Sequence, residues 1–390
     1  MNSLGALALA ALVAAPAPAA PTATLPEPTG PHPVGITELH LVDHTRQDPW
    51  VPGAVRELVV DIRYPSSRTG EPARFTPPPV AEVVAAEDAA VVGVDPGELD
   101  YTFPTHSSAG TPAIGRHPVV LYSPGRGVSR AFGTALAEQL ASRGYVVVSL
   151  DHTHEAPAVA FPDGRVARRA LPPSSVEVSK RIMATRVQDT RFVLDQLEVL
   201  AGGGNPDAAR RALPRGLGLA LDLSEVGMFG HSGGGFTAGE TMVSDRRIDA
   251  GADLDGSMGY SQSDRDFGRV ADEGLDRPFL FMSAGDHSAA SDASWQEFLR
   301  NHRGWSRQLH IPAGEHFTYT DHQALLPGLV ARLGLDPAVV HPIIGTVDPV
   351  RALAAQRAYL TAFFDQHLRH KPQRLLDGPS AAHPDVRFLG

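Results

Sequence analysis

The stretch Glu225-Val-Gly-Met-Phe-Gly-His-Ser-Gly-Gly-Gly235 contains the pattern that decides the fold of this 390-residue chain. An apolar run over residues 226–229 leads into a glycine-rich turn, and the Ala/Gly/Thr/Met segment after the turn is compatible with a helix. A serine at the centre of so sharp a turn has a strained backbone, so only glycine fits easily two residues before it and two residues after it. Gly230 and Gly234 occupy those positions around Ser232. The stretch therefore predicts a strand, a tight turn that exposes Ser232, and a helix, which together form a nucleophile elbow.

The chain around this stretch favours the same interpretation over an ordinary glycine-rich loop. Residues 118–122 and 145–150 are continuous apolar runs, typical of strands buried on both faces of a parallel sheet. Residues 131–143, between them, have helical spacing. Strands that alternate with helices in this way imply right-handed crossovers. We therefore predict an α/β-hydrolase fold, with a mostly parallel, doubly wound sheet, helices on both faces and a small cap segment.

The remaining pattern predicts one catalytic domain over residues 36–370, followed by a C-terminal tail over 371–390. Residues 36–42 and 57–63 alternate apolar with polar residues, which predicts antiparallel strands at the edge of the sheet. The segment 77–97 predicts a short helix that is either a cap over the site or an ordinary surface helix. Later in the chain we expect a helix over 174–200, strands over 250–254, 278–283 and 307–311, and a terminal helix over 347–368.

The N-terminus indicates export. Residues 4–14 form an apolar stretch of signal-peptide length, and the Ala/Pro segment 15–20 offers a cleavage site near Ala19, although no Lys or Arg precedes the stretch. We expect a signal peptide over 1–19, a Pro-rich linker over 20–35 and a secreted protein. The alternative is a disordered Ala/Pro tail on a cytoplasmic protein.

Composition narrows the class of partner. The net charge is −10 and no block of Lys and Arg is present, which argues against nucleic acid and against an anionic membrane surface. We expect a monomer that acts on a small-molecule or lipid ester, with at most weak contact to a lipid interface. The chain has no cysteine, so it has no disulfide, thiol nucleophile or cysteine-bound metal. The segment 151–155 is predicted to be a solvated loop or pocket wall, and no metal or organic cofactor is expected.

A serine nucleophile needs a histidine to accept its proton and a carboxylate to orient that histidine. In this fold the order along the chain is serine, acid, histidine. His316 follows the last predicted sheet strand and lies in a turn, so we predict it as the base. Asp255 and Asp286 each follow a later strand and compete for the role of acid; spacing alone favours Asp286. The other downstream histidines are expected to be structural or solvated: His287, His302, His310, His322 and His341.

The predicted oxyanion hole consists of two backbone N–H groups aimed at the oxygen on which negative charge develops. One belongs to Gly233, the residue after the nucleophile. The other is assigned to Arg126, in the loop Ser123-Pro-Gly-Arg-Gly127 that follows a predicted strand.

With these residues placed, the chain resembles the platelet-activating-factor acetylhydrolase family of serine esterases, and more loosely the cutinase-type lipases and polyester hydrolases of actinobacteria. The resemblance rests on the strand Leu58-Val-Val-Asp-Ile-Arg-Tyr-Pro65, the Ser-Pro-Gly-Arg loop where the family commonly has Ser-His-Gly, and the Gly-His-Ser-Gly-Gly elbow. The segments Leu254-Asp-Gly-Ser-Met258 and His316-Phe-Thr-Tyr-Thr-Asp321 are similar to the family's acid and histidine motifs.

The resemblance implies that Asp255 is the acid, because it follows the serine by an interval that the family favours. Pro124 departs from the family pattern and is more similar to the cutinase-type enzymes, whose acid stands where Asp286 stands, so both candidates remain. The implied activity is hydrolysis of short-acyl or lipid esters through an acyl-enzyme. The alternatives are a lipase or cutinase-like polyester hydrolase and, in another class, a hydrolase-fold binding protein without turnover.

Overall fold

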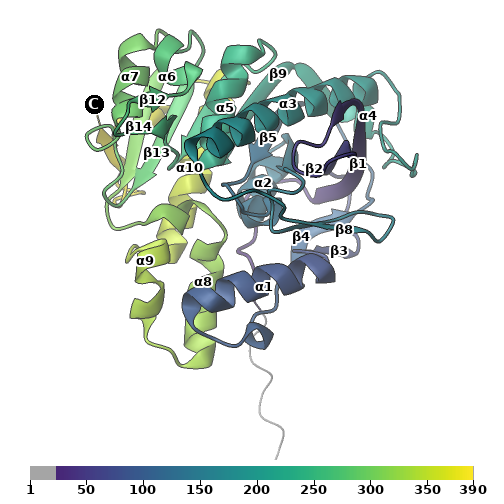
Figure 1. Ribbon diagram of the computed structural model, residues 1–390, viewed down its shortest axis with the longest axis horizontal. Coiled ribbons are helices and arrows are strands. Elements are labelled where there is room, and N and C mark those ends of the chain that lie inside the picture. Colours follow the sequence, from purple (N-terminus) through teal and green to yellow (C-terminus); the bar gives the residue numbers. More distant parts are fainter. Residues whose placement is uncertain (1–22, 390) are drawn as a thin grey trace, which may run out of the picture.

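The computed structural model describes residues 23–389, and the expected signal peptide over 1–19 lies outside them (Figure 1). Within that range, an eleven-stranded sheet runs through the molecule in the order β15-β14-β13-β10-β9-β5-β6-β2-β1-β4-β3. Its strands are β1 Val34–Gln47, β2 Val55–Pro65, β3 Pro72–Arg74, β4 Pro104–Ala109, β5 His117–Ser123, β6 Val146–Asp151, β9 Leu221–His231, β10 Ala250–Leu254, β13 Phe279–Ala284, β14 Ser306–Ile311 and β15 Arg387–Leu389. Two small hairpins pair β7 Ala158–Ala160 with β8 Val166–Arg168, and β11 Gly259–Ser261 with β12 Asp266–Phe267.

The centre of the sheet is parallel, as the apolar runs predicted. Strands β6, β5, β9, β10, β13 and β14 pair in parallel, while β2 joins β6, and β15 joins β14, in the antiparallel sense. Side chains alternate between the two faces of β5: Val119 and Leu121 enter one core, and Val120 and Tyr122 enter the other. Both faces are therefore apolar, which explains the unbroken hydrophobic run.

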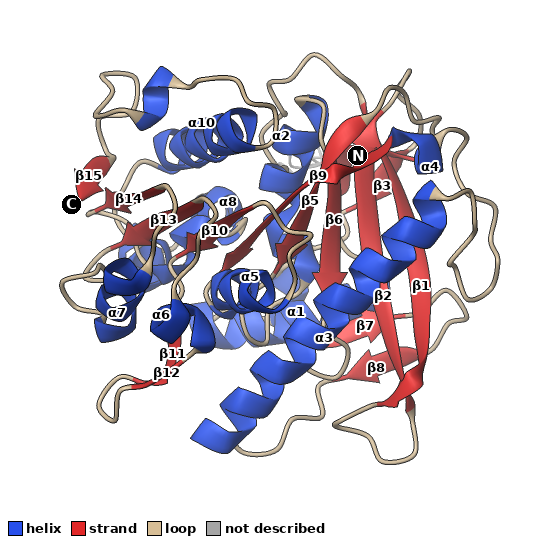
Figure 2. Cartoon of the chain, turned by 90° about the horizontal axis from the view of Figure 1, so that it is seen from above, coloured by secondary structure: helices blue, strands red, loops and turns tan. Residues whose placement is uncertain are grey.

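Helices cover both faces, as Figure 2 shows. They are α1 Pro78–Val92, α2 Thr134–Ser142, α3 Val176–Ala201, α4 Leu217–Ala220, α5 Gly233–Ser244, α6 Arg269–Glu273, α7 Ala293–Asn301, α8 His322–Leu333, α9 His341–Ile344 and α10 Pro349–His367. One core contains residues of α3, α5, α6 and α7, and the opposite core contains residues of α2 and α10. The predicted α/β-hydrolase architecture is thus confirmed. No helix of residues 23–389 is long and apolar enough to cross a bilayer.

The predicted position of the first two strands was wrong. Strands β1 and β2 do not form the edge, because β4 and β3 lie outside them. The sequence pattern did not reveal β4, since its buried side chains are polar. Ser107, for example, is buried and donates a hydrogen bond to Glu138 Oε1 (2.6 Å). A strand that satisfies buried hydroxyls in this way has no apolar signature.

The domain extends beyond the predicted boundaries at both ends. Of the expected linker, Leu25 is buried, and Arg357 of α10 donates to the carbonyl oxygens of Pro26 (2.8 Å) and Glu27 (2.9 Å). Of the expected C-terminal tail, Leu376 is buried and β15 pairs with β14. The described parts of both segments, residues 25–35 and 371–389, therefore belong to the folded domain.

The predicted solvated loop over 151–155 is wrong, whereas the pocket-wall alternative holds at Asp151, which lines a pocket together with Arg130. Asp151, His152 and Glu155 are buried. The His152 ring bridges the Asp189 carboxylate (3.0 Å) and the Ser123 hydroxyl (3.0 Å). The partners come from distant parts of the chain, so the local sequence could not indicate them.

The segment 77–97, expected to be a cap or a surface helix, contains helix α1. The end of this helix, at Val92, packs with Leu326 and Val330 of α8, and Figure 1 shows the two helices side by side. Val84 and Val91 on α1 line a groove that also contacts Arg126. The helix therefore borders the candidate site.

Candidate active site

Ser232 lies where β9 ends and α5 begins. Its backbone has φ 54° and ψ −125°, the strained conformation that the elbow pattern predicts. A Cβ atom at Gly234 would lie 1.9 Å from the carbonyl oxygen of Ser123, and one at Gly230 would lie 2.2 Å from the carbonyl carbon of Gly234. The close approach of these backbones is the physical reason for both glycines.

His316 and Asp255 meet beside this elbow. His316 begins a 3-10 turn, His316–Tyr319, after β14, and Asp255 directly follows β10. Nδ1 of His316 lies 2.7 Å from Oδ2 of Asp255. The neighbouring His231 lies with its ring centre 4.6 Å from that of His316 and donates from Nε2 to the His316 carbonyl oxygen (2.9 Å). These contacts hold the His316 ring next to the serine turn.

The two candidate acids have different environments. Asp286 is exposed, and its backbone carbonyl accepts a hydrogen bond from Ser291. Asp255 is buried and also accepts from the backbone N–H of Ala284 (2.9 Å). The structure thus brings Asp255, and not Asp286, against His316.

The electrostatic environment keeps Asp255 ionised. Burial would raise the pKa of Asp255, but its hydrogen bonds to His287 and His316 and the positive charge of His287 hold that pKa well below its ordinary value. Burial lowers the pKa of the adjacent His231 to about 3, so that ring is neutral. His287 was expected to be structural or solvated; it instead contacts Asp255, with Nδ1 3.0 Å from Oδ1.

The predicted oxyanion groups also lie together. A Cβ atom at Gly233 would lie 3.5 Å from the backbone nitrogen of Arg126, so the Ser123–Gly127 loop faces the start of α5. The Arg126 side chain points to α3, with its guanidinium 3.2 Å from the Ser179 hydroxyl.

Arg186 on α3 holds this loop in place, a role that the sequence did not reveal. Its guanidinium donates to the carbonyl oxygens of Pro124 (2.8 Å) and Gly125 (3.1 Å), and to Glu155 (2.5 Å). Arg186 is buried. An arginine among the apolar residues of a helix was the only available signal, and it did not identify the partner.

A groove of about 540 Å³ starts at the Arg126 loop. Its walls come from α1, from the loop over residues 126–129 and from Phe317, the residue after His316; Val84, Val91, Phe132, Leu171, Pro172 and Phe317 make it largely apolar. The groove has room for part of a small organic ester.

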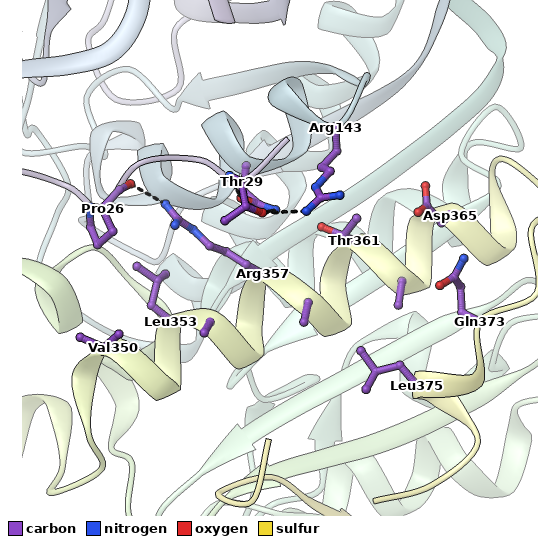
Figure 3. Close-up of a pocket in the computed structure, with 14 residues that line it drawn as sticks. Pro26, Thr29, Arg143, Val350, Leu353, Arg357, Thr361, Asp365, Gln373 and Leu375 are labelled. Carbon is purple, nitrogen blue, oxygen red and sulfur yellow. Dashed lines mark hydrogen bonds between the residues drawn. The ribbon is translucent and has the colours of Figure 1, made fainter. Parts of the chain in front are cut away.

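A second cavity, about 490 Å³, lies along α10 (Figure 3). Leu353, Arg357 and Thr361 line it, with Pro26 and Thr29 of the N-terminal segment opposite. None of its lining residues belongs to the elbow or to the loops that carry Arg126, Asp255 and His316. We therefore place the candidate site at the elbow. Among residues 23–389, no group of three or more His, Cys, Asp or Glu side chains could hold a metal ion.

The fold and this arrangement define the class: an α/β-hydrolase with a serine at its nucleophile elbow. A family model described as platelet-activating factor acetylhydrolase, isoform II, matches residues 97–377, and the chain belongs to that family. The resemblance seen in the sequence is thus confirmed.

Individual proteins show the same relationship. The chain is 31% identical over 284 residues to a probable 1-alkyl-2-acetylglycerophosphocholine esterase from Arthroderma benhamiae, covering 70% of this chain and 66% of that protein. It is 22% identical over 221 residues to a platelet-activating factor acetylhydrolase from Cavia porcellus, covering 53% and 49%. The chain therefore spans about two thirds of the length of the Arthroderma benhamiae protein and about half of the length of the Cavia porcellus protein.

A solved structure extends the similarity to nearly the whole chain. A ferulic acid esterase from Streptomyces cinnamoneus is 40% identical, with a TM-score of 0.73, over 93% of this chain and 98% of that one. The first and the last of these proteins are named as esterases, and the second as an acetylhydrolase.

Proposed function

We propose that this protein hydrolyses carboxylic esters through an acyl-enzyme on Ser232. The observation that carries the proposal is the 2.7 Å contact between His316 Nδ1 and Asp255 Oδ2 beside a serine in the strained elbow conformation. Because the carboxylate occupies Nδ1, Nε2 is the nitrogen left to accept the proton of the serine hydroxyl. The esterase relatives support the same chemistry.

In the proposed reaction, Ser232 Oγ attacks the ester carbonyl carbon while His316 takes its proton. The N–H groups of Gly233 and Arg126 donate to the negative oxygen of the tetrahedral intermediate, and one such donor is typically worth about 2.7–4 kcal/mol. His316 then protonates the leaving alcohol, and the acyl group stays on Ser232. A water molecule deprotonated by His316 releases the carboxylic acid, while Asp255 fixes the tautomer and stabilises the imidazolium.

The proposed substrates are short-acyl or lipid esters, as expected for the platelet-activating factor acetylhydrolase family. A second candidate, an ester of an aromatic acid, is favoured by the near full-length similarity to a ferulic acid esterase. Phe317, a half-buried residue in the wall of the groove, offers an aromatic ring to such an acid. The lipase and polyester hydrolase alternatives call for longer acyl chains.

The test is hydrolysis of p-nitrophenyl esters from acetate to palmitate, a platelet-activating-factor analogue and methyl ferulate, with wild type and Ser232→Ala. We expect Ser232→Ala to lower kcat by roughly 10⁴-fold or more, because the nucleophile is lost. Activity that falls with acyl length supports a short-acyl esterase, and a preference for methyl ferulate supports the aromatic-acid alternative.

Ser224→Ala is the matched control, since Ser224 lies on the same strand but is exposed. It is expected to keep wild-type rates. Turnover that survives Ser232→Ala would contradict the mechanism. A wild type that binds esters without turnover would instead favour the binding-protein alternative.

We also propose that the protein is exported. The apolar stretch over residues 4–14 and the Ala/Pro segment ending near Ala19 support this. Mass spectrometry of protein secreted by a suitable host should show a mature chain that begins near residue 20. Retention of the complete chain inside the cell would contradict export.

A further inference from the structure

We propose that His287 is a positioning residue of this site: as an imidazolium it bridges Asp255 and Asp292, and thereby holds Asp255 in place and keeps His316 free to act as a base. The inference rests on the proposed function, in which Asp255 and His316 serve Ser232. It adds a second histidine and a second carboxylate to the three proposed catalytic groups.

The Asp255 carboxylate is held on both of its oxygens. Oδ2 lies 2.7 Å from His316 Nδ1, whereas Oδ1 lies 3.0 Å from His287 Nδ1 and accepts from the N–H of Ala284 at 2.9 Å. The other ring nitrogen of His287, Nε2, lies 3.0 Å from Asp292 Oδ2. The contacts form one continuous chain from Asp292 to His316.

This geometry indicates the protonation state of His287. An ionised carboxylate only accepts hydrogen bonds, so an imidazole that faces a carboxylate on each nitrogen must carry both protons. Asp292 also accepts from the backbone N–H groups of Ser294 and Trp295 at the start of α7, which favours its ionised form. Burial would raise the pKa of Asp292, but the His287 hydrogen bond and others lower it to about 2. Burial would lower the pKa of His287, but the two carboxylates raise it to about 10.

The protein fixes the His287 ring from several sides. Its backbone N–H donates to the Ala284 carbonyl oxygen (3.0 Å), and its ring centre lies 4.7 Å from that of Trp295. The Trp295 indole in turn donates to the carbonyl oxygen of Gly256, the residue after Asp255 (2.7 Å). His287 therefore contacts the loop after β10 in two ways: directly at the Asp255 carboxylate, and through Trp295 at the Gly256 carbonyl oxygen.

The negative charges of Asp255 and Asp292 explain why a positive charge is needed between them. Asp255 and Asp292 together would favour a protonated His316, and a histidine that already holds a proton cannot accept one from Ser232. The positive charge of His287 offsets one of the two negative charges. The remaining negative charge stabilises the His316 imidazolium when it forms during the reaction.

The other buried groups that face this cluster favour their neutral forms, and the acidic side chains of Asp286 and Glu315 beside it are exposed to solvent. Burial raises the pKa of Asp253 well above its ordinary value, which favours its neutral form, and burial lowers the pKa of His310, which disfavours a positive charge there. The Tyr319 hydroxyl, whose pKa burial also raises, donates to the Ser283 carbonyl oxygen (2.8 Å). The neutral His231 ring lies on the other side of His316, and the Glu315 carboxylate lies near Gly285. His287 therefore supplies the positive charge that offsets Asp255 and Asp292.

The experiment compares the pH dependence of kcat/KM for wild type and His287→Gln. Glutamine keeps a donor of similar size but carries no charge. We expect the acid limb of the profile to move up by about one pH unit, because the uncompensated carboxylates make His316 hold its proton to higher pH. We expect kcat to fall severalfold, well short of the roughly 10⁴-fold effect of losing the orienting carboxylate of a triad, while KM is unchanged.

Two variants provide controls. His302→Gln changes a half-buried histidine just beyond α7 that bonds the Trp305 carbonyl oxygen, and it should leave the profile unmoved. Asp292→Asn removes a negative charge and must not move the acid limb upward. An unmoved limb in His287→Gln, even with a lower melting temperature, would overturn the positioning role and leave the proposed function intact. Activity that survives Ser232→Ala would overturn both.

A measurement on the unmodified enzyme tests the protonation state directly. In protein labelled with ¹⁵N-histidine, one imidazole should keep both nitrogens protonated at about pH 8, where an ordinary histidine is neutral. If every imidazole has lost a proton at that pH, the proposal is wrong.

Discussion

At the scale of single residues, Ser232 and Asp255 are both non-glycine residues with positive φ, 54° and 62°. Conformations of this kind typically cost about 1–3 kcal/mol each and persist where the surroundings enforce them. Here the Ser232 N–H donates to the Leu254 carbonyl oxygen (2.8 Å), and the Asp255 N–H donates to that of Met282 (2.7 Å). Neighbouring strands therefore hold the proposed nucleophile and acid in place.

Replacing each aspartate by asparagine separates the two candidate acids. Asp255→Asn should lower kcat by roughly 10³- to 10⁴-fold with little change in KM, because an amide stabilises the wrong tautomer of His316. Asp286→Asn should behave like wild type, since that side chain is exposed. Kinetics on a p-nitrophenyl ester measure both. A large loss in Asp286→Asn alone would assign the acid role to that residue.

At the scale of elements, the C-terminal segment 371–389 completes one edge of the molecule. Strand β15 pairs with β14, and the Leu376 carbonyl oxygen accepts from Arg307 Nε (3.2 Å). The Leu376 side chain is 1% exposed. The segment therefore contributes to stability, although it lies outside the predicted domain.

Leu376→Ala should lower the free energy of unfolding by about 2–5 kcal/mol, as expected for removing a buried leucine side chain. Leu219 is 79% exposed, so Leu219→Ala is the matched control and should change it by less than about 0.5 kcal/mol. Urea denaturation of both variants provides the measurement. Equal stabilities would show that the C-terminal segment is not held against the domain in solution.

At the scale of the whole molecule, a buried network of charges joins β2, α3 and the loop after β6. Arg56 donates to Asp48 (2.8 Å), to Asp189 (2.5 Å) and to the Thr153 carbonyl oxygen (2.8 Å), and His154 bonds Asp48 (3.0 Å). Burial would raise the pKa of Asp48, but His154 and Arg56 lower it to about 2. Arg56 and His152 likewise hold the pKa of Asp189, despite its burial, far below its ordinary value.

This network predicts acid sensitivity. A carboxylate whose pKa is lower in the folded state stabilises it fully above the unfolded pKa of about 4, and this contribution is lost as pH falls through the folded value. For Asp48 the stabilisation is about 2 kcal/mol at pH 7 and disappears between about pH 4 and pH 2. Asp48→Asn should therefore be less stable than wild type at pH 7, with a gap that narrows as the solution is acidified. If urea titrations show that the difference in free energy of unfolding between wild type and Asp48→Asn does not change with pH, this prediction is wrong.

Much of the fold could be predicted because its signals are local. The apolar runs at β5, β6 and β13 each have the length of a buried strand, and glycine spacing alone indicates the turn at Ser232. Strand β4 escaped prediction because Ser107 satisfies its hydroxyl by a contact distant in sequence. The positions of β1 and β2 in the sheet depend on that missed strand.

The sequence by itself determined the fold class and singled out Ser232 and His316 as the candidate nucleophile and base, because each depends on a short pattern and on order along the chain. Only the tertiary structure decided which aspartate faces His316, since Asp255 and Asp286 both follow strands that end at the same edge of the sheet. It also placed Arg186 under the oxyanion loop and His287 on Asp255. The role of a charged side chain depends on the buried partner that it contacts, and those partners come from distant segments of the chain.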